Sequence, residues 1–397
     1  MSLKVVIGGY DAHGSSTAAT IARALNIPVE DLIVKFPDTS PENLPKLLYA
    51  LSLYNAEITI VDIAINVKDP NGFLKTLELT ANNNNVTMID HHESNTRFLP
   101  LIPKGVRFLQ LMTAADMAKT IRDMYQVKEN DYQLLLIGVI GDRDPNIREL
   151  ISIESNEFQR LYSIANTYDV LIRQNVQTAV RGIYSEGVSY VERQMGSVQY
   201  PPAQIADQLM QNVKRFDNTI YVEFVPQQNT SMWIWKIFDE LLRRTGADYL
   251  VSVSKVLDRQ INQLVDVVFI VKYWLSQAPS PKPLLQNIIY NRRTIGHDDG
   301  FSITATSVED ARQLAQQIIS ALQSNFSSSV SLIPSQQVAS ALQSDFRKIM
   351  ESQNQILSTL TEILQEMRDM YKKYLELKDE QVSMLRRMSS TEAHRAD

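Results

Sequence analysis

A pair of adjacent histidines and the acid before them are the residues whose types could most readily do chemistry. Val86 to Asn95 reads VTMIDHHESN, a run suited to a strand that is followed by Asp90, His91 and His92. The chain of 397 residues holds five histidines, and these two stand together where a buried strand would meet solvent. Imidazole beside carboxylate is a good ligand set for a divalent cation.

Further carboxylates follow or lie within other apolar runs of the first 150 residues. Asp11 comes after LKVVIGG, Asp62 lies within EITIVDIAIN, and Asp142 ends the apolar stretch LLLIGVIGD. With His91 these three acids form a set suited to Mn²⁺ or a related divalent ion. Two such ions about 4 Å apart would clamp a phosphoryl group and lower the pKa of a bridging water. The alternative is that each aspartate only caps a helix, since strand-to-helix turns favour Asp there.

The elements expected around these residues form a parallel sheet. Runs rich in β-branched residues alternate with helical patterns, with the runs at 3–9, 31–36, 57–66 and 86–89. That alternation indicates βαβ units. Since ligands of such sheets bind at the carboxyl ends of the strands, we expect the acids and histidines to gather on one edge of this sheet, Asp142 included.

The rest of the chain predicts a second α/β domain and a tail. After a first domain over 1–150 we expect a helical linker over 151–215 and a second, smaller α/β domain over 216–325. The fold class is therefore α/β, with two domains facing each other across a cleft. The serine-rich stretch 324–335 is typical of a hinge.

The tail, residues 336–390, carries a heptad pattern. Mostly apolar residues keep a 4-3 spacing from Leu342 to Met388, which predicts a coiled coil. Isoleucines at successive d positions favour three strands over a parallel dimer, so we expect a homotrimer. The alternatives are a helix docked on its own domain, or a partner protein's helix that supplies the other strands.

Composition excludes several kinds of site. The absence of cysteine rules out a disulfide scaffold, a thiolate metal site and a cysteine nucleophile. A net charge of -6 argues against broad coating of nucleic acid but leaves room for a local basic groove. No apolar run approaches the length of a membrane span and no signal-peptide pattern follows Met1, so we expect a soluble, cytoplasmic protein.

IDHHESN resembles the signature of the DHH phosphoesterase superfamily, whose members include RecJ nucleases, oligonucleotide-degrading phosphodiesterases and pyrophosphatases. YDAHGSS, VDIAIN and GVIGD resemble the other motifs of that superfamily in order and spacing, and RRTIGHDDGF resembles the histidine motif of the DHH-associated C-terminal domain. The resemblance covers about 1–325 and points to the branch of archaeal-type nucleases and replication factors. Four of the five histidines fall in these motifs: His13, His91, His92 and His297.

The resemblance implies a role for each candidate ligand. Asp62 would bridge two ions, most readily Mn²⁺, with Mg²⁺ or Zn²⁺ as other choices. Asp11 would serve one ion, and His91 with Asp142 the other. His13 stands where the family usually has a second aspartate, so a neutral ligand replaces a charged one and the metal preference should shift.

Catalytic and substrate contacts are also implied. His92 would contact substrate phosphate or assist proton transfer, and Asp90 would orient the histidines. The C-terminal motif would hold the phosphate backbone of a bound strand through Gly296, His297, Arg292 and Arg293.

The activity implied is that of a RecJ-like exonuclease, a metal-dependent phosphodiesterase acting on single-stranded DNA or RNA in DNA repair or replication. One alternative is a catalytically weakened scaffold that partners a replicative helicase or another replisome protein. Another is a phosphodiesterase for short oligonucleotides or small nucleotides. A scaffold has no physical need to keep Asp62, the DHH triplet, Asp142 and His297 together.

Two further features have two interpretations each. Gly14, Ser15 and Ser16 would either present backbone N–H groups to an anion or provide a plain serine N-cap. The tryptophans would either stack nucleic-acid bases or pack in the core, and the apolar helical pattern around Trp233 and Trp235 favours the core.

Overall fold

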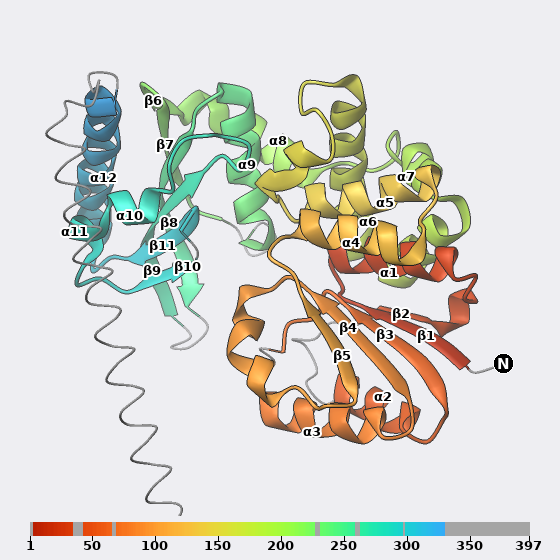
Figure 1. Ribbon diagram of the computed structural model, residues 1–397. Coiled ribbons are helices and arrows are strands. Elements are labelled where there is room, and N and C mark those ends of the chain that lie inside the picture. The colour runs from red at the N-terminus through yellow and green to blue at the C-terminus, as the bar shows by residue number, and fades with distance from the viewer. Residues whose placement is uncertain are drawn as a thin grey trace, which may run out of the picture. The chain divides into compact units, whose positions relative to one another are not determined.

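Two separate β-sheets organise the part of the chain that the structure, a computed structural model, describes (Figure 1). The described residues are 3–34, 43–65, 69–226, 231–258, 263–296 and 298–329. His297 and the predicted coiled coil over 336–390 lie outside them. The expectation of two α/β units, the first with a parallel sheet, is confirmed.

The first sheet is entirely parallel and has the strand order β2-β1-β3-β4-β5. Four of its strands match the predicted runs, and the fifth was missed because only one of its residues is buried. The strands are β1 Leu3–Gly8, β2 Leu32–Val34, β3 Ala56–Val61, β4 Asn85–Asp90 and β5 Val106–Gln110.

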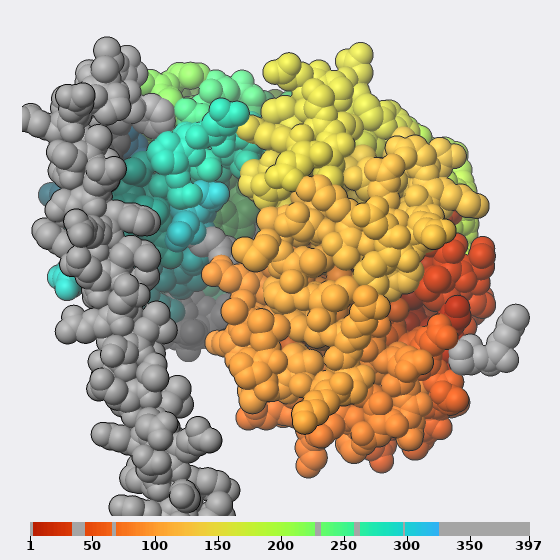
Figure 2. Space-filling model, viewed as in Figure 1, coloured from red at the N-terminus to blue at the C-terminus, as the bar shows by residue number. Residues whose placement is uncertain are grey.

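Helices cover both faces of this sheet. Apolar side chains of α2 (Asn43–Leu51) and α3 (Pro70–Ala81) share one core with residues of β1, β3 and β4. A second core joins the other face to α1 (Ala12–Ala24), α4 (Ala114–Tyr125) and α5 (Glu129–Gly141). Figure 1 shows these two groups of helices on opposite sides of the sheet, and in Figure 2 the segment from α3 to α5 (orange to yellow) forms a continuous outer surface. The carboxyl ends of the strands therefore meet along one edge of a three-layer domain.

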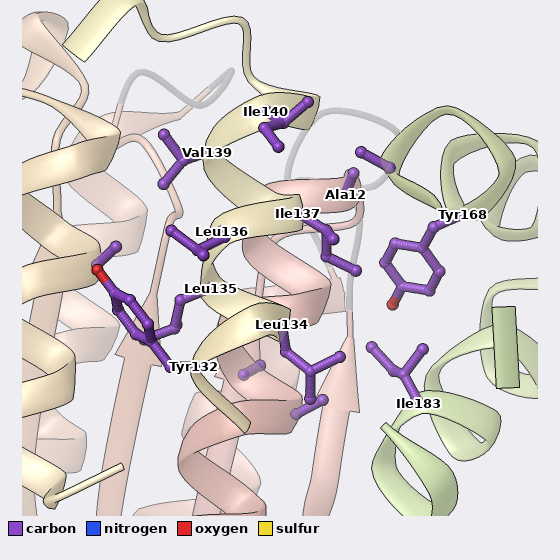
Figure 3. Packing of buried hydrophobic residues seen from close by; sticks show 14 of the residues in the cluster. Ala12, Tyr132, Leu134, Leu135, Leu136, Ile137, Val139, Ile140, Tyr168 and Ile183 are labelled. Atoms are coloured by element: carbon purple, nitrogen blue, oxygen red, sulfur yellow. The ribbon is translucent and has the colours of Figure 1, made fainter. Parts of the chain in front are cut away.

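The apolar stretch before Asp142 is a helix, and our expectation that Asp142 lies at the end of a sheet strand is wrong. Residues 134–140 of α5 are all buried, and in Figure 3 their side chains point to opposite sides of the helix. A helix that is apolar all round is a buried one, and its sequence cannot be told from a buried strand by periodicity alone. Asp142 caps the C-terminus of α5.

Helices α1 and α5 approach each other closely at two glycines. A Cβ atom added to Gly138 would lie 2.6 Å from Ser16 Oγ, and one added to Gly141 would lie 2.7 Å from Ala12 Cβ. The missing side chains let the backbones come together. This approach places the residues that begin α1 beside Asp142.

We expect Gly141→Ala to lower the free energy of unfolding by about 1–3 kcal/mol, the usual cost of overpacking. The Cβ of Ala12 cannot rotate away, so the two helices must shift. Urea unfolding would measure the loss. The matched control is Gly196→Ala, where an added Cβ meets nothing within 4 Å, and equal midpoints for the two variants would contradict the expectation.

Helices connect the two sheets. They are α6 Asn156–Glu186, α7 Val188–Gln194 and α8 Pro201–Leu209. Short 3-10 helices lie at Val29–Asp31, Glu93–Leu101, Pro145–Glu149, Met210–Asn212 and Ser231–Trp233. Within the described residues, no helix is both long enough and apolar enough to cross a membrane.

The second sheet is mixed, with the order β10-β11-β9-β8-β7-β6 and one parallel pair, β7 with β8. Helix α9 (Ile234–Thr245) shares a core with one face, and α12 (Val308–Ser329) lies on the other (Figure 1). The predicted hinge is wrong over 324–329, which continue α12. The remaining elements are β6 Lys214–Phe216, β7 Thr219–Phe224, β8 Tyr249–Asp258, β9 Gln263–Lys272, α10 Pro281–Leu284, α11 Gln286–Ile289, β10 Thr294–Gly296 and β11 Gly300–Thr304.

Candidate metal centre

Asp62 occupies the first position after β3 and has a left-handed backbone with φ 54°. Asp tolerates this conformation better than most residues because its short side chain bonds locally. Gly9 leaves room for this residue, because a Cβ atom on Gly9 would lie 2.4 Å from the Asp62 carbonyl oxygen. The carboxylate is buried, with Asp62 only 4% exposed. The sheet therefore places one buried acid at the middle of its carboxyl edge.

Two histidines converge on this carboxylate, and Asp142 lies beside one of them. Asp62 Oδ1 lies 3.1 Å from His13 Nδ1 and 3.1 Å from His91 Nε2, and His91 Nε2 lies 3.5 Å from Asp142 Oδ2. Neighbouring ligand atoms of an octahedral ion with bonds of about 2.1 Å are about 3 Å apart. The spacing fits a divalent cation.

Buried polar atoms without a hydrogen bond also indicate a cation site here. Among the described residues, the buried atoms His13 Nδ1, Asp62 Oδ1 and His91 Nε2 have no hydrogen bond of acceptable geometry. A buried polar atom left without a partner costs about 1–3 kcal/mol. Three such atoms facing one another form a place that a divalent cation would fit. His13, His91 and Asp142 form one group able to hold an ion, and Asp62, Asp90, His91 and His92 form a second.

Asp90 is a fully buried acceptor that orients the histidine pair. Its Oδ1 accepts from His92 Nδ1 at 2.6 Å and from the backbone amides of His91 at 2.6 Å and His92 at 3.0 Å. Its Oδ2 accepts from Asn95 Nδ2 at 2.8 Å, and Asn95 Oδ1 accepts from the amide of Ile65. This geometry suits the orienting task more than direct ligation. Asn95 was missed, although it lies inside the motif that drew attention to the site.

The charged side chains of the candidate centre shift one another's pKa values. Burial lowers the pKa of His13, but the carboxylate of Asp62 outweighs this and raises the pKa to about 10. Burial raises the pKa of Asp62, but His13 and His91 hold it well below its ordinary value. Desolvation lowers the pKa of His92, but its hydrogen bond to Asp90 raises it to about 9. Ligand imidazoles must be neutral, so His13 would have to lose its proton in order to hold a cation.

Asp11 caps helix α1 through one carboxylate oxygen, and its role as a metal ligand stays a prediction. Its Oδ1 accepts from the amide of Gly14 at 2.8 Å. Desolvation and the nearby carboxylates of Asp62 and Asp142 raise the pKa of Asp11 to about 7. The prediction of a serine N-cap is wrong, because Asp11 is the N-cap residue of α1. The prediction that Gly14, Ser15 and Ser16 bind an anion is also wrong, because the Gly14 amide already donates to Asp11 and Ser15 is buried.

We expect His13→Asp to raise the affinity for Mn²⁺ or Mg²⁺ relative to Zn²⁺, since a charged oxygen ligand replaces a neutral nitrogen. Calorimetric titration of the three ions into both proteins measures the change. His13→Asn is the matched control because it has the size of aspartate without its charge. An unchanged preference in His13→Asp would show that this position does not contact the ion.

The predicted phosphate contacts of the second sheet are only partly available. Arg292 makes two hydrogen bonds to Asp310, of 2.9 and 3.0 Å, which tie it to α12. Arg293 follows it in the same turn. Gly296 has φ 125°, and a Cβ there would lie 2.4 Å from the Gly300 carbonyl oxygen. Arg292 therefore has a structural partner, while Gly296 permits a tight turn between β10 and β11.

The two acids of this turn pair with lysines. Asp298 lies 3.6 Å from Lys282 Nζ, and Asp299 lies 3.5 Å from Lys272 Nζ. Ser280 also donates to Asp299. The negative charges beside the predicted phosphate contacts are thus balanced locally by lysines.

The tryptophans divide into two classes. Trp233 and Trp274 are buried, at 6% and 8% exposed, as the core interpretation predicts. Trp235 is 43% exposed, so that interpretation is wrong for this residue.

Arg143 was missed and links the candidate centre to the second sheet. It directly follows Asp142 and has a left-handed backbone with φ 61°. Its Nε lies 3.0 Å from Asp239 Oδ2 of α9, and its guanidinium donates to Asn166 Oδ1 at 2.9 Å and to the Ile140 carbonyl at 3.0 Å. Burial lowers the pKa of Arg143, but the charge of Asp239 outweighs this and raises it. Nothing in the sequence pairs these residues.

The chain is similar to solved structures of RecJ-like proteins, the group that its DHH-type motifs resemble. RecJ of Thermus thermophilus in complex with Mn²⁺ is 15% identical with a TM-score of 0.46, and the match covers 81% of this chain and 52% of that one. An exonuclease RecJ bound to manganese is 15% identical with a TM-score of 0.43, covering 81% and 90%. CDC45 of Entamoeba histolytica is 9% identical with a TM-score of 0.37, covering 81% and 95%.

The chain thus spans about half the length of the Thermus protein. No model of a protein family matches the sequence, and no curated protein sequence matches it.

Proposed function

We propose that the chain is a divalent-metal-dependent phosphodiesterase of the DHH type, acting as a RecJ-like exonuclease on single-stranded DNA or RNA. The observation that carries this proposal is the meeting of Asp62, His13 and His91 at 3.1 Å spacings, buried and without hydrogen bonds. Two ions of the Mn²⁺ type are the proposed cofactors, with Mg²⁺ or Zn²⁺ as other choices.

The residues divide into a holding group and a substrate-facing group. Asp62, His13, His91 and Asp142 would hold the ions, which when bound supply Lewis-acid and water-activating chemistry to a phosphodiester. His92 is only partly buried, with 39% of its side chain exposed, and its Nδ1 is engaged by Asp90. Its Nε2 is therefore the nitrogen left to contact a phosphate oxygen or to hold a proton.

A scaffold role is the second candidate, because Asp11 is used as a helix cap and His13 replaces a carboxylate. Such a protein would partner a replicative helicase. It would have no need to keep Asp62 buried within 3.1 Å of both His13 and His91. The third candidate, hydrolysis of short oligonucleotides or small nucleotides, shares the chemistry and differs in substrate length.

The homotrimer stays a prediction, since 336–390 lie outside the described residues.

The experiment that tests the proposal is a Mn²⁺ titration with end-labelled single-stranded DNA and RNA, from dinucleotides to long strands. We expect Mn²⁺-dependent release of nucleotides that EDTA abolishes. Degradation of the shortest substrates alone would favour the third candidate. If neither DNA nor RNA is degraded in any divalent ion, the scaffold role replaces the enzyme.

A further inference from the structure

A pocket of about 310 Å³ lies where α6 meets elements of the second sheet, and none of its residues belongs to the candidate metal centre. It is bounded by the chain before α6, the first two turns of α6, the end of α9 and the chain after β9. Pockets that bind small molecules occur preferentially at such junctions between structural units. This position makes the pocket a candidate binding site in its own right.

Apolar and aromatic side chains form most of the pocket. Phe158 and Tyr162 of α6 are buried, at 2% and 6% exposed, whereas Ile153, Tyr273 and Leu275 are half-buried. All five line the pocket. A lining of this kind suits a planar ligand with apolar faces.

The ring of Tyr162 is held in place by the protein itself. Its hydroxyl donates to Asp239 Oδ2 at 3.0 Å. Its ring centroid lies 6.2 Å from that of Phe158 and 5.7 Å from the guanidinium carbon of Arg243. A wall that is already fixed loses little conformational freedom when a ligand packs against it.

Glu154 determines which polar groups a ligand must carry at one end of the pocket. The residue is exposed, and within the described part of the chain its carboxylate has neither a hydrogen bond nor an ion pair. An ionised carboxylate only accepts hydrogen bonds, and its charge disfavours a phosphate beside it. The ligand must therefore bring N–H or O–H donors to Glu154.

Arg243 presents the opposite chemistry. Its Nη2 donates to Glu240 Oε2 at 2.9 Å, but a guanidinium has five N–H groups and no acceptor. The side chain is 40% exposed, so it can also donate to a ligand in the pocket. Because Glu240 balances its charge, Arg243 contributes hydrogen bonding and not net charge. The third polar side chain, Gln159, donates to the Ile153 carbonyl at 3.4 Å.

We propose that this pocket binds a guanine base. Guanine has two adjacent donors, N1–H and the N2 amino group, which match the two oxygens of the Glu154 carboxylate. It also has two adjacent acceptors, O6 and N7, which match the fork of the Arg243 guanidinium. Adenine has its N6 amino group between two acceptors, so it can pair fully with neither side chain. This site is separate from the metal centre and does not depend on the proposed function.

The test is a calorimetric titration of the full chain with guanosine, inosine and adenosine in EDTA. A nucleoside carries no phosphate and EDTA removes divalent ions, so neither the candidate metal centre nor hydrolysis contributes. We expect guanosine to bind about 5- to 150-fold more tightly than adenosine, the discrimination provided by one good bidentate contact. Inosine, which is guanosine without the N2 amino group, should bind with an intermediate affinity.

Two variants assign the contacts. Glu154→Gln should weaken guanosine binding by about 5- to 150-fold and remove most of its advantage over inosine, because the lost carboxylate oxygen is the partner of the N2 amino group. Arg243→Lys keeps the charge beside Glu240 but loses the fork. It should weaken guanosine and inosine binding by equal factors, since both nucleosides carry O6 and N7.

The control is Glu30→Gln, which changes an exposed carboxylate of the 3-10 helix Val29–Asp31, outside this pocket. Its guanosine affinity should equal that of the wild type. The guanine site is overturned by an absence of guanosine binding, by adenosine binding as tightly as guanosine, or by an unchanged guanosine affinity in Glu154→Gln.

Discussion

Asp62→Asn is expected to abolish Mn²⁺ binding and to lower phosphodiesterase activity by at least about 100-fold, because a metal ion contributes several kcal/mol to stabilising the transition state. Asparagine keeps the size of the side chain and also tolerates the left-handed backbone of this position. Asp62→Ala should lose the same activity and, in addition, about 1–2 kcal/mol of stability from backbone strain. Comparing the two variants separates the lost ligand from the strained turn.

Calorimetry with Mn²⁺ and release of label from single-stranded substrates measure the two effects. Asp116→Asn is the control, since its carboxylate is exposed and pairs with Lys119 at the surface, and it should behave as the wild type. Metal-dependent hydrolysis that persists in Asp62→Asn would falsify the assignment of this edge of the sheet as the active centre.

Arg143→Ala is expected to lower the free energy of unfolding by about 3 kcal/mol, since it leaves the buried carboxyl group of Asp239 without its main charge partner. We take the lower end of the usual range because 16% of the Arg143 side chain is exposed, against 9% for Asp239. Urea unfolding followed by circular dichroism measures the loss.

Arg312→Ala is the comparison for this effect. Arg312 pairs with Glu223 at 2.8 Å, but both side chains are nearly half exposed, so we expect at most about 1 kcal/mol. Arg143→Met combined with Asp239→Leu should recover most of the stability, because apolar residues of similar volume replace the pair. Equal losses for Arg143→Ala and Arg312→Ala would contradict a special role for the buried pair.

The parallel sheet and the convergence on Asp62 were predictable because both follow from local patterns. β-Branched runs such as LKVVIGG form strands, and the carboxyl ends of parallel strands meet at one edge. Any acid or histidine just after such a strand therefore lies near the others. That is why His91 and Asp62 were found from the sequence.

Asp142 was identified for a wrong structural reason. It reaches the centre from the end of a helix, and it can do so because Gly138 and Gly141 let α5 approach α1. Close approach of two helices depends on contacts between distant parts of the chain, which periodicity does not encode. The same holds for the pairing of Arg292 with Asp310 and for the exposure of Trp235, since each depends on which face a neighbouring element covers.

Asp142 and Arg143 are consecutive residues with different contacts, and their adjacency links cation binding to the packing of α9. One side chain belongs to the proposed cation site and the next is anchored on α9, with their Cα atoms one peptide step of about 3.8 Å apart. If the contact between Arg143 and Asp239 stabilises the position of Asp142 that binds a cation, then a bound cation must stabilise that contact by the same free energy. Cation binding and the packing of α9 against Arg143 are then linked equilibria. The difference in Mn²⁺ affinity between the wild type and Arg143→Ala measures their coupling.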